Sequence, residues 1–354
     1  MRVKMPFRFG IVGAGAVAET HVRAMEMLPD VRPVAVADVD LRRARSFAAR
    51  HGIAKAYRSV EDLLEGSPVD AVDVLTPHHL HLSAVEAAVR ARKPVLVEKA
   101  LAETAVAADK LIEVCQAGGV VLGGIFQNRF SEAGITLKRT VEERRLGRLF
   151  QASVSVNACR SAAYYHSVPW RGRKAEAGGG VLMVQAIHAL DLLQWTLGMP
   201  RRVLARTATA VHPIEVEDLA VGLLEFEGGV VAVLQATTAA VPEVPPELEI
   251  RGDAGTAAVF DSRGDLGFWC STREAPASLP SRWSLYASHY HEQEPTIPMQ
   301  ASPAPHAENI RDFVAAVQTD RPPRVDGIEA AKVVRIIDTL YRSAERGEWL
   351  PVAR

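Results

Sequence analysis

The sequence predicts a two-domain protein: an α/β N-terminal Rossmann domain with a doubly wound parallel sheet, then an α+β domain with a large, mainly antiparallel open sheet. The chain has 354 residues, too many for one ordinary core. Strand-like and helix-like segments alternate as far as residue 125, which is typical of a parallel sheet. Later segments alternate polar and apolar residues, as antiparallel strands do. We expect domains at 1–125, which binds a dinucleotide, and 126–354, which binds substrate and forms oligomers.

The first expected strand, residues 7–12, runs into the sequence GAGAVA. Gly13 and Gly15, with a small residue three positions later, have the G-x-G-x-x-G/A spacing of dinucleotide-binding turns. Gly13 permits a tight turn, and Gly15 lets the backbone approach a pyrophosphate. The next helix begins at Ala16 and Val17, so its free N–H groups and positive dipole end would face the phosphates.

A second expected strand ends at Asp38, about 20 residues beyond the glycines. An acidic residue there can accept hydrogen bonds from the adenine ribose hydroxyls, and it repels a 2′-phosphate. The sequence therefore favours NAD over NADP as the cofactor. Arg42 and Arg43 follow closely and keep NADP open.

Three further expected strands, 70–76, 93–99 and 120–126, end at the sheet edge where doubly wound folds bind ligands. The polar residues at these ends are Thr76, Pro77, His78, His79 and His81, then Glu98 and Lys99, then Gln127, Asn128 and Arg129. Lys99 ends an otherwise Val-Leu-Val strand, where burial would lower the pKa of a lysine and let it exchange a proton near neutral pH. The alternative is a lysine that reaches solvent or pairs with Glu98.

The second half is expected to form one large sheet. A helix is expected near 132–145, and strands at 149–158, 202–210, 218–226, 230–238, 247–252, 256–260 and 265–270. One face should pack on helices, including 178–197, and the other should be half exposed, which favours pairing of subunits. We expect a homodimer or homotetramer formed through this sheet, and two amphipathic helices between 308 and 346.

Charge and cysteine content limit the partners. A net charge of −1 gives no electrostatic reason to expect nucleic acid or a membrane surface. Three dispersed cysteines fit a reducing cytoplasm, and we identify neither a signal peptide nor an apolar run long enough to span a bilayer. The spacing of His289, His291, Glu292 and Glu294 fits no standard metal site, so we expect no metal.

Five segments occur in one order: GAGAVAETH, TPHHLH, VLVEKALAET, YYHSVPWRG and GGGVLMVQAIHALD. Together they resemble the glucose–fructose oxidoreductase / inositol dehydrogenase (Gfo/Idh/MocA) family over nearly the whole chain. Residues 126–130, 164–172 and 182–195 look most like the branch that acts on sugar nucleotides. The resemblance implies an NAD(P)-dependent oxidoreductase that moves a hydride between nicotinamide and a secondary hydroxyl or ketone of a sugar or sugar nucleotide.

The resemblance also implies roles for single residues. Lys99 would transfer a proton at the substrate hydroxyl, His188 would lie near the reacting carbon, and Asp191 would contact substrate hydroxyls. The expected cofactor contacts are Gly13, Gly15, Ala16, Val17, Asp38, Thr76, Pro77, His81, Glu98, Gln127 and Trp170. The resemblance also implies that Tyr165 contacts the substrate. Arg129, Arg160 and Arg171 are further expected substrate contacts, because the guanidinium group matches a diphosphate or carboxylate. Each arginine could equally be an ordinary surface residue.

Two positions depart from the family pattern. Ala100 stands where the family has proline after the lysine, and Val184 stands where many members have Asp or Asn. Val184 is expected on the same helix face as His188, where it supplies no polar group. Three other functions stay open: an inositol or cyclitol dehydrogenase, a non-catalytic NAD-binding sensor, and an NADP-type reductase of trans-diols or bilins.

Overall fold

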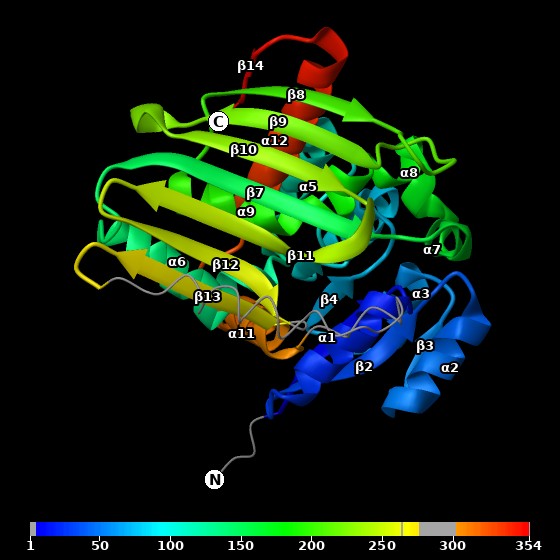
Figure 1. Ribbon diagram of the computed structural model, residues 1–354. Helices are drawn as coiled ribbons and strands as arrows, with labels where there is room; N and C mark the ends of the chain where they lie inside the picture. Colours follow the sequence, from blue (N-terminus) through cyan, green and yellow to red (C-terminus); the bar gives the residue numbers. More distant parts are fainter. Residues whose placement is uncertain (1–4, 263–264, 276–301, 354) are drawn as a thin grey trace. The chain divides into compact units, whose positions relative to one another are not determined.

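The computed structural model describes residues 5–262, 265–275 and 302–353, which form two compact units (Figure 1). The first unit combines Met1–Gln127 with Pro303–Val334, and the second combines Asn128–Ser302 with Arg335–Arg354. Pro303–Val334 was expected in the second domain, 126–354. These residues join the first unit because α11 (Ala304–Thr319) packs on α1 (Ala16–Glu26). No metal site was expected in the segment that contains His289, His291, Glu292 and Glu294. That segment lies outside the described residues.

The first unit is built on a six-stranded parallel sheet in the order β3-β2-β1-β4-β5-β6. Its strands are β1 (Phe7–Val12), β2 (Val31–Ala37), β3 (Lys55–Tyr57), β4 (Ala71–Val74), β5 (Val95–Val97) and β6 (Leu122–Gly124). The order reverses direction between β1 and β4, where doubly wound sheets bind their ligands. The predicted Rossmann fold is confirmed.

Helices connect these strands, as the alternating pattern of the sequence predicts. They are α2 (Leu41–His51), α3 (Val60–Gly66), α4 (His81–Arg90) and α5 (Ala105–Gly118). Asp40, Ser59 and Thr104 each accept a backbone N–H at the start of the helix that follows. Such caps satisfy N–H groups that have no partner within the helix, and they explain where α2, α3 and α5 begin.

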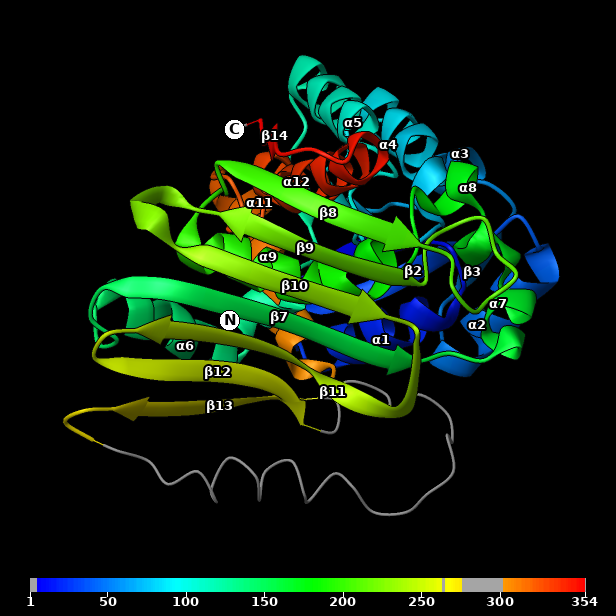
Figure 2. The same cartoon turned by 45° about the horizontal axis from the view of Figure 1, so that its top comes forward.

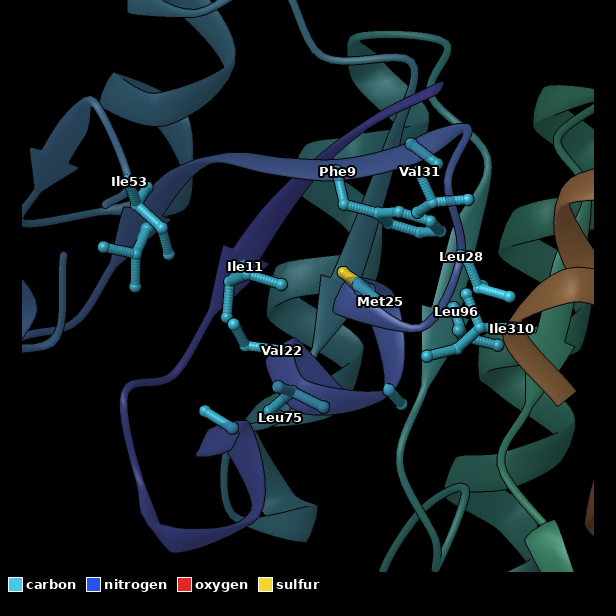
Figure 3. Close-up of a cluster of buried hydrophobic side chains, with 14 of the residues drawn as sticks. Phe9, Ile11, Val22, Met25, Leu28, Val31, Ile53, Leu75, Leu96 and Ile310 are labelled. Atoms are coloured by element: carbon cyan, nitrogen blue, oxygen red, sulfur yellow. The ribbon is translucent and has the colours of Figure 1, made fainter. Parts of the chain in front are cut away.

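The core of the first unit lies between the sheet, α1 and α11. Figure 3 shows Phe9 and Ile11 of β1 beside Val22 and Met25 of α1, with Ile310 of α11 in the same cluster. All five side chains are fully buried. Burial of one such side chain contributes about 1.5–3 kcal/mol, so α11 is an integral part of this core.

The second unit contains an eight-stranded sheet in the order β13-β12-β11-β7-β10-β9-β8-β14 (Figure 2). Its strands are β7 (Leu149–Cys159), β8 (Arg202–Ala208), β9 (Leu219–Glu225), β10 (Val231–Thr237), β11 (Ala239–Gly252), β12 (Gly255–Ser262), β13 (Asp265–Thr272) and β14 (Leu350–Pro351). Neighbouring strands are antiparallel except β7 and β10, which run parallel. The mainly antiparallel sheet is confirmed, although β11 starts earlier than the predicted strand and β14 was not predicted.

Helices cover one face of this sheet. Figure 2 shows α6 (Glu132–Glu142) and α9 (Ile187–Leu197) behind its strands, and both contact them. The unit also contains α7 (Ala162–Ser167), α8 (Lys174–Ala177) and the C-terminal part of α12 (Gly327–Arg346). Leu219, Val221 and Val233 are exposed on β9 and β10. Their exposure agrees with a half-exposed face, while the oligomer stays a prediction.

No apolar run was expected to be long enough to span a bilayer, and this expectation was wrong. The segment Lys174–Leu197 is long and apolar enough to cross a membrane, because its most apolar 18-residue stretch has a mean hydropathy of 1.2. However, 72 % of that stretch is buried inside the protein, as in the core helix of a folded domain. A core helix therefore accounts for this apolar segment.

Candidate functional site

The turn after β1 has the backbone that the glycine motif requires. Gly13 has φ +103°, and a Cβ there would lie 2.7 Å from the Leu75 carbonyl oxygen, so a larger residue does not fit. A Cβ at Gly15 would meet no described atom within 4 Å. Open space therefore adjoins the start of α1, where N–H groups at Ala16 and Val17 can face a pyrophosphate.

Asp38, directly after β2, holds this turn. Its Oδ2 accepts the Ala14 N–H at 3.0 Å, and its Oδ1 accepts the Asp40 N–H at 2.9 Å. A carboxylate has about four acceptor positions, which leaves capacity for ribose hydroxyls. Arg43 Nη1 lies 3.5 Å from Asp38 Oδ2, whereas the Arg42 side chain is 93 % exposed.

The strand-end residues of the first unit differ in their surroundings. The Thr76 hydroxyl and the Gln127 side-chain oxygen are buried and have no hydrogen-bond partner among the described residues. Buried polar atoms are usually paired, so both atoms fit a site completed by a cofactor. With the space at Gly15 and the carboxylate of Asp38, these residues fit a bound NAD.

His81 lies behind this edge and joins two loops. Its Nε2 is 2.9 Å from the Thr76 carbonyl oxygen, and its Nδ1 is 3.1 Å from the Leu101 carbonyl oxygen. Burial lowers the pKa of His81, so the neutral ring has one N–H and donates to one of these carbonyls. The His81 ring is fully buried, and its contact with the Thr76 carbonyl oxygen holds the turn at Thr76 and Pro77 in place.

Glu98 precedes Lys99 at the end of β5 and belongs to a buried cluster that the sequence analysis missed. Glu98 Oε2 accepts the Lys99 N–H at 2.8 Å, and Glu98 Oε1 lies 3.1 Å from His21 Nε2. His21 Nδ1 lies 2.7 Å from Asp73 Oδ2 of β4. The peptide bond between Lys99 and Ala100 is cis. The available signal was Asp73, an acidic residue inside the apolar strand segment AVDVL.

His306 of α11 completes this cluster. One ring nitrogen each of His21 and His306 and one carboxylate oxygen of Glu98, all atoms of a kind that can bind a metal, lie within 4.8 Å of one another. Both ring nitrogens of His21 already face carboxylates at hydrogen-bond distance. We interpret the group as a hydrogen-bonded cluster, and the absence of a metal stays a prediction.

In the second unit, glycines begin the helix that carries His188. A Cβ at Gly179 would lie 1.9 Å from the Tyr341 hydroxyl, and one at Gly180 would lie 1.9 Å from the Glu217 carbonyl oxygen. Larger side chains would push this helix start away from Glu217 and Tyr341. The glycines are therefore required for close packing at this end.

The Glu217 carboxylate caps the same helix start. It accepts the N–H groups of Gly180 at 2.8 Å and Leu182 at 3.0 Å, and the Tyr341 hydroxyl donates to it at 2.8 Å. Burial raises the pKa of Glu217, although these hydrogen bonds act against that shift. Negative charge at a helix N-terminus is stabilising, so Glu217 anchors the helix.

A π-helix, Leu182–Ala186, precedes α9. Between residues 181 and 194, only Val184, Gln185 and His188 are partly exposed, and we call these three the His188 face. Val184 thus shares the open side with His188, as expected. Gln185 was not among the expected site residues, and its Nε2 donates to the Tyr164 hydroxyl at 3.3 Å. π-Helical turns are frequent at functional sites.

Arg129 and Asp191 were expected to contact substrate, but the structure pairs them in the interior. Arg129 Nε and Nη2 donate to the two Asp191 oxygens at 2.9 and 2.7 Å, and Nη2 also donates to Gln194 at 3.0 Å. The two residues are 2 % and 0 % exposed. Solvent scarcely reaches this pair, so its geometry is that of an internal brace between residues 127–130 and α9.

The remaining expected substrate residues surround Tyr164. The guanidinium carbons of Arg160 and Arg171 lie 5.6 and 4.4 Å from its ring centroid, and Arg160 Nη1 is 3.1 Å from Glu243. Tyr165 is buried and shares a hydrogen bond of 2.9 Å with Thr238. Trp170 is partly exposed in a short 3-10 helix, Pro169–Gly172. The expected site residues thus form one group in each unit.

Two family models match the chain. Residues 7–125 match an oxidoreductase family with an NAD-binding Rossmann fold, and residues 135–258 match the GFO/IDH/MocA C-terminal domain. Together these two matches span more than half of the chain.

Named relatives match as well. The chain is 34 % identical to 1,5-anhydro-D-fructose reductase of Ensifer adhaerens over 229 residues, 64 % of this chain and 67 % of that protein. It is 25 % identical to D-apiose dehydrogenase of Paraburkholderia graminis over 347 residues, 96 % and 88 % of the two chains. The WlbA dehydrogenase from Bordetella pertussis, solved with NADH and UDP-GlcNAcA, has a TM-score of 0.84 at 26 % identity, covering 99 % of each chain.

Proposed function

The chain belongs to the GFO/IDH/MocA family of NAD-binding oxidoreductases, and we propose that it transfers a hydride between NAD and a secondary hydroxyl or ketone of a sugar or sugar nucleotide. Its relatives include enzymes named as a sugar reductase and a sugar dehydrogenase, and also a myo-inositol dehydrogenase and trans-1,2-dihydrobenzene-1,2-diol dehydrogenases. The observation that carries this proposal is the place of Lys99. It lies two residues beyond the end of β5, and the sheet order separates β5 from the glycine turn of β1 by only one strand.

The proposed chemistry assigns the proton to Lys99. Bound NAD accepts or supplies the hydride. In oxidation, the hydride leaves the substrate carbon, the hydroxyl proton passes to neutral Lys99 Nζ, and a C=O bond forms; in reduction, the Lys99 ammonium returns the proton. His188 would hydrogen-bond the reacting hydroxyl. A positioned base or acid contributes about 10²–10⁴-fold in rate.

For the substrate we favour a sugar nucleotide. Two guanidinium groups beside the Tyr164 ring, those of Arg160 and Arg171, match the charge of a diphosphate or uronate. The similar WlbA structure was solved with UDP-GlcNAcA, a ligand of that kind. Arg129 and Asp191 are outside the proposed substrate contacts, because they bind each other in the interior.

The activity test mixes purified protein and NAD with UDP-linked sugars, free sugars and cyclitols while NADH fluorescence is recorded. We expect turnover with a UDP-linked sugar and loss of at least about 10²-fold in kcat for Lys99→Met. Lys93→Met is the matched control, because Lys93 is also half-buried and precedes the same strand. Turnover of cyclitols alone would replace the substrate assignment, and cofactor binding without redox change would indicate a sensor.

The role of His188 is tested separately. We expect His188→Ala to lower kcat less than Lys99→Met, with NADH binding unchanged. The reverse order would make His188 the main proton acceptor. The first unit, which contains the expected domain 1–125, is proposed to bind cofactor, and the second unit to bind substrate, in a cytoplasmic homodimer or homotetramer. The exposed apolar side chains of Val221 and Val233 on the sheet face support an oligomer. Light scattering measures the number of subunits.

A further inference from the structure

We propose that His21 is a positioning residue: a buried imidazolium, held between Asp73 and Glu98, that fixes Glu98 and offsets its negative charge beside Lys99. The inference rests on the proposed proton transfer by Lys99. All the residues involved lie in the first unit, on α1, on β4, after β5 and on α11.

The protonation of His21 follows from its two partners. His21 is 0 % exposed, and each ring nitrogen lies at hydrogen-bond distance from a carboxylate, Asp73 at 2.7 Å and Glu98 at 3.1 Å. A neutral imidazole has one N–H, so one nitrogen lone pair would face a carboxylate oxygen. Only the imidazolium donates to both. Burial opposes the charge, but the two carboxylates raise the pKa of His21 to about 10.

The two carboxylates are held differently. Glu98 receives a hydrogen bond at each oxygen, from His21 and from the Lys99 N–H. Burial acts to raise the pKa of Glu98, yet His21, with smaller effects of Lys99 and His306, lowers it to about 2. Burial raises the pKa of Asp73, whose Oδ1 has no hydrogen-bond partner among the described residues. Glu98 is therefore the ionised partner that matters for Lys99.

The consequence concerns the charge next to Lys99. With His21 protonated, its positive charge offsets part of the Glu98 charge, so Glu98 stabilises a Lys99 ammonium less than an isolated carboxylate would. Without His21, the Glu98 carboxylate would favour the protonated lysine, which cannot accept a proton. The other groups that face His21 are Asp73 and the His306 ring, whose centroid lies 5.5 Å away. His21 thus keeps Lys99 ready to act as a base.

The first experiment measures the pH dependence of kcat in the oxidation direction. We expect His21→Gln to move the acid limb up by about one pH unit, which lowers kcat about tenfold below that limb. The double variant His21→Gln/Glu98→Gln should move the limb back, because it removes the carboxylate. A structural role alone would not reverse the shift in this way. An unshifted limb in His21→Gln, or no reversal in the double variant, would overturn the proposal.

The matched control is His51→Gln. His51 also pairs with a carboxylate, Glu19, at 2.6 Å in the same unit, and Glu19 accepts a second hydrogen bond from Arg50. We expect its pH profile to match that of the unmodified enzyme.

A second measurement uses the unmodified protein, in case His21→Gln does not fold. ¹⁵N-histidine NMR at about pH 9 should show one ring with both nitrogens protonated, because ordinary histidines are neutral well above their pKa of about 6.5. The absence of any imidazolium there would overturn the proposal. The result is independent of turnover, so failure of the Lys99 assignment and failure of the His21 assignment are distinguishable.

Discussion

The Glu217 carboxylate accepts the Gly180 N–H at 2.8 Å, at the start of the helix that carries His188. The contact joins a loop before β9 to a glycine whose Cβ would collide with Glu217 itself. We expect Glu217→Ala to lower the free energy of unfolding by about 1–2 kcal/mol, because a helix cap is lost. Glu217→Gln keeps an acceptor and should cost less. Denaturant titration measures both, and exposed Glu143→Ala should stay within about 0.5 kcal/mol of the unmodified protein.

The Arg129–Asp191 pair should behave as an internal brace. Arg129→Met removes the guanidinium that offsets the charge of the buried Asp191 carboxylate, which costs about 3–5 kcal/mol of stability. Arg129→Met/Asp191→Leu removes both charges and should recover most of that loss. Urea melts measure the three proteins, with the surface pair Arg202–Glu225 as reference, where Arg202→Ala should cost under about 1 kcal/mol. A raised KM at unchanged stability would instead return Arg129 to the substrate contacts.

Asp38 should set the cofactor preference. We expect lower Kd values for NADH than for NADPH, since a 2′-phosphate would meet this carboxylate. Asp38→Ser removes a charged acceptor, so NADH affinity should fall about 10–100-fold while NADPH binding changes less. Fluorescence titration with both cofactors measures the ratio. A preference of the unmodified enzyme for NADPH would contradict the assignment.

Asp218 should make stability fall in acid. Burial opposes ionisation, but the N–H groups of residues 210–212 and the His212 ring lower its pKa below the usual range. Its folded-state pKa is thus below the unfolded one. The stabilisation is present above the unfolded pKa, near 4, and is lost as pH falls through the folded pKa. In thermal melts across this range, Asp218→Asn should be less stable at neutral pH and show a flatter acid decline.

The fold was predictable because its signals are local. The strand before Gly13, the turn itself and the following helix are adjacent in sequence, and strand alternation after residue 149 needs no distant partner. The internal pairs were not predictable in this way. Arg129 and Asp191 are 62 positions apart, and nothing in the periodicity of either segment indicates that they meet.

The chemistry-bearing residues divide in the same way. Lys99 was identified because it interrupts an apolar strand at its end. His21 was overlooked because a histidine on a helix has no marked local pattern, and its charge depends on carboxylates 52 and 77 positions away. Gln185 was missed because the segment was expected to be an α-helix, and the sequence pattern does not indicate the wider π-helical turn before α9.

That wider turn has a consequence for comparing sequences. A π-helical turn contains one more residue than the α-helical turn it replaces. A relative that lacks one residue between 182 and 186 could keep every neighbouring letter and still rotate the next positions by about 100° around the helix axis. Alignment of this segment by identity alone would then equate side chains that point in different directions. The number of residues between the glycines and His188 is therefore as informative about function as the histidine itself.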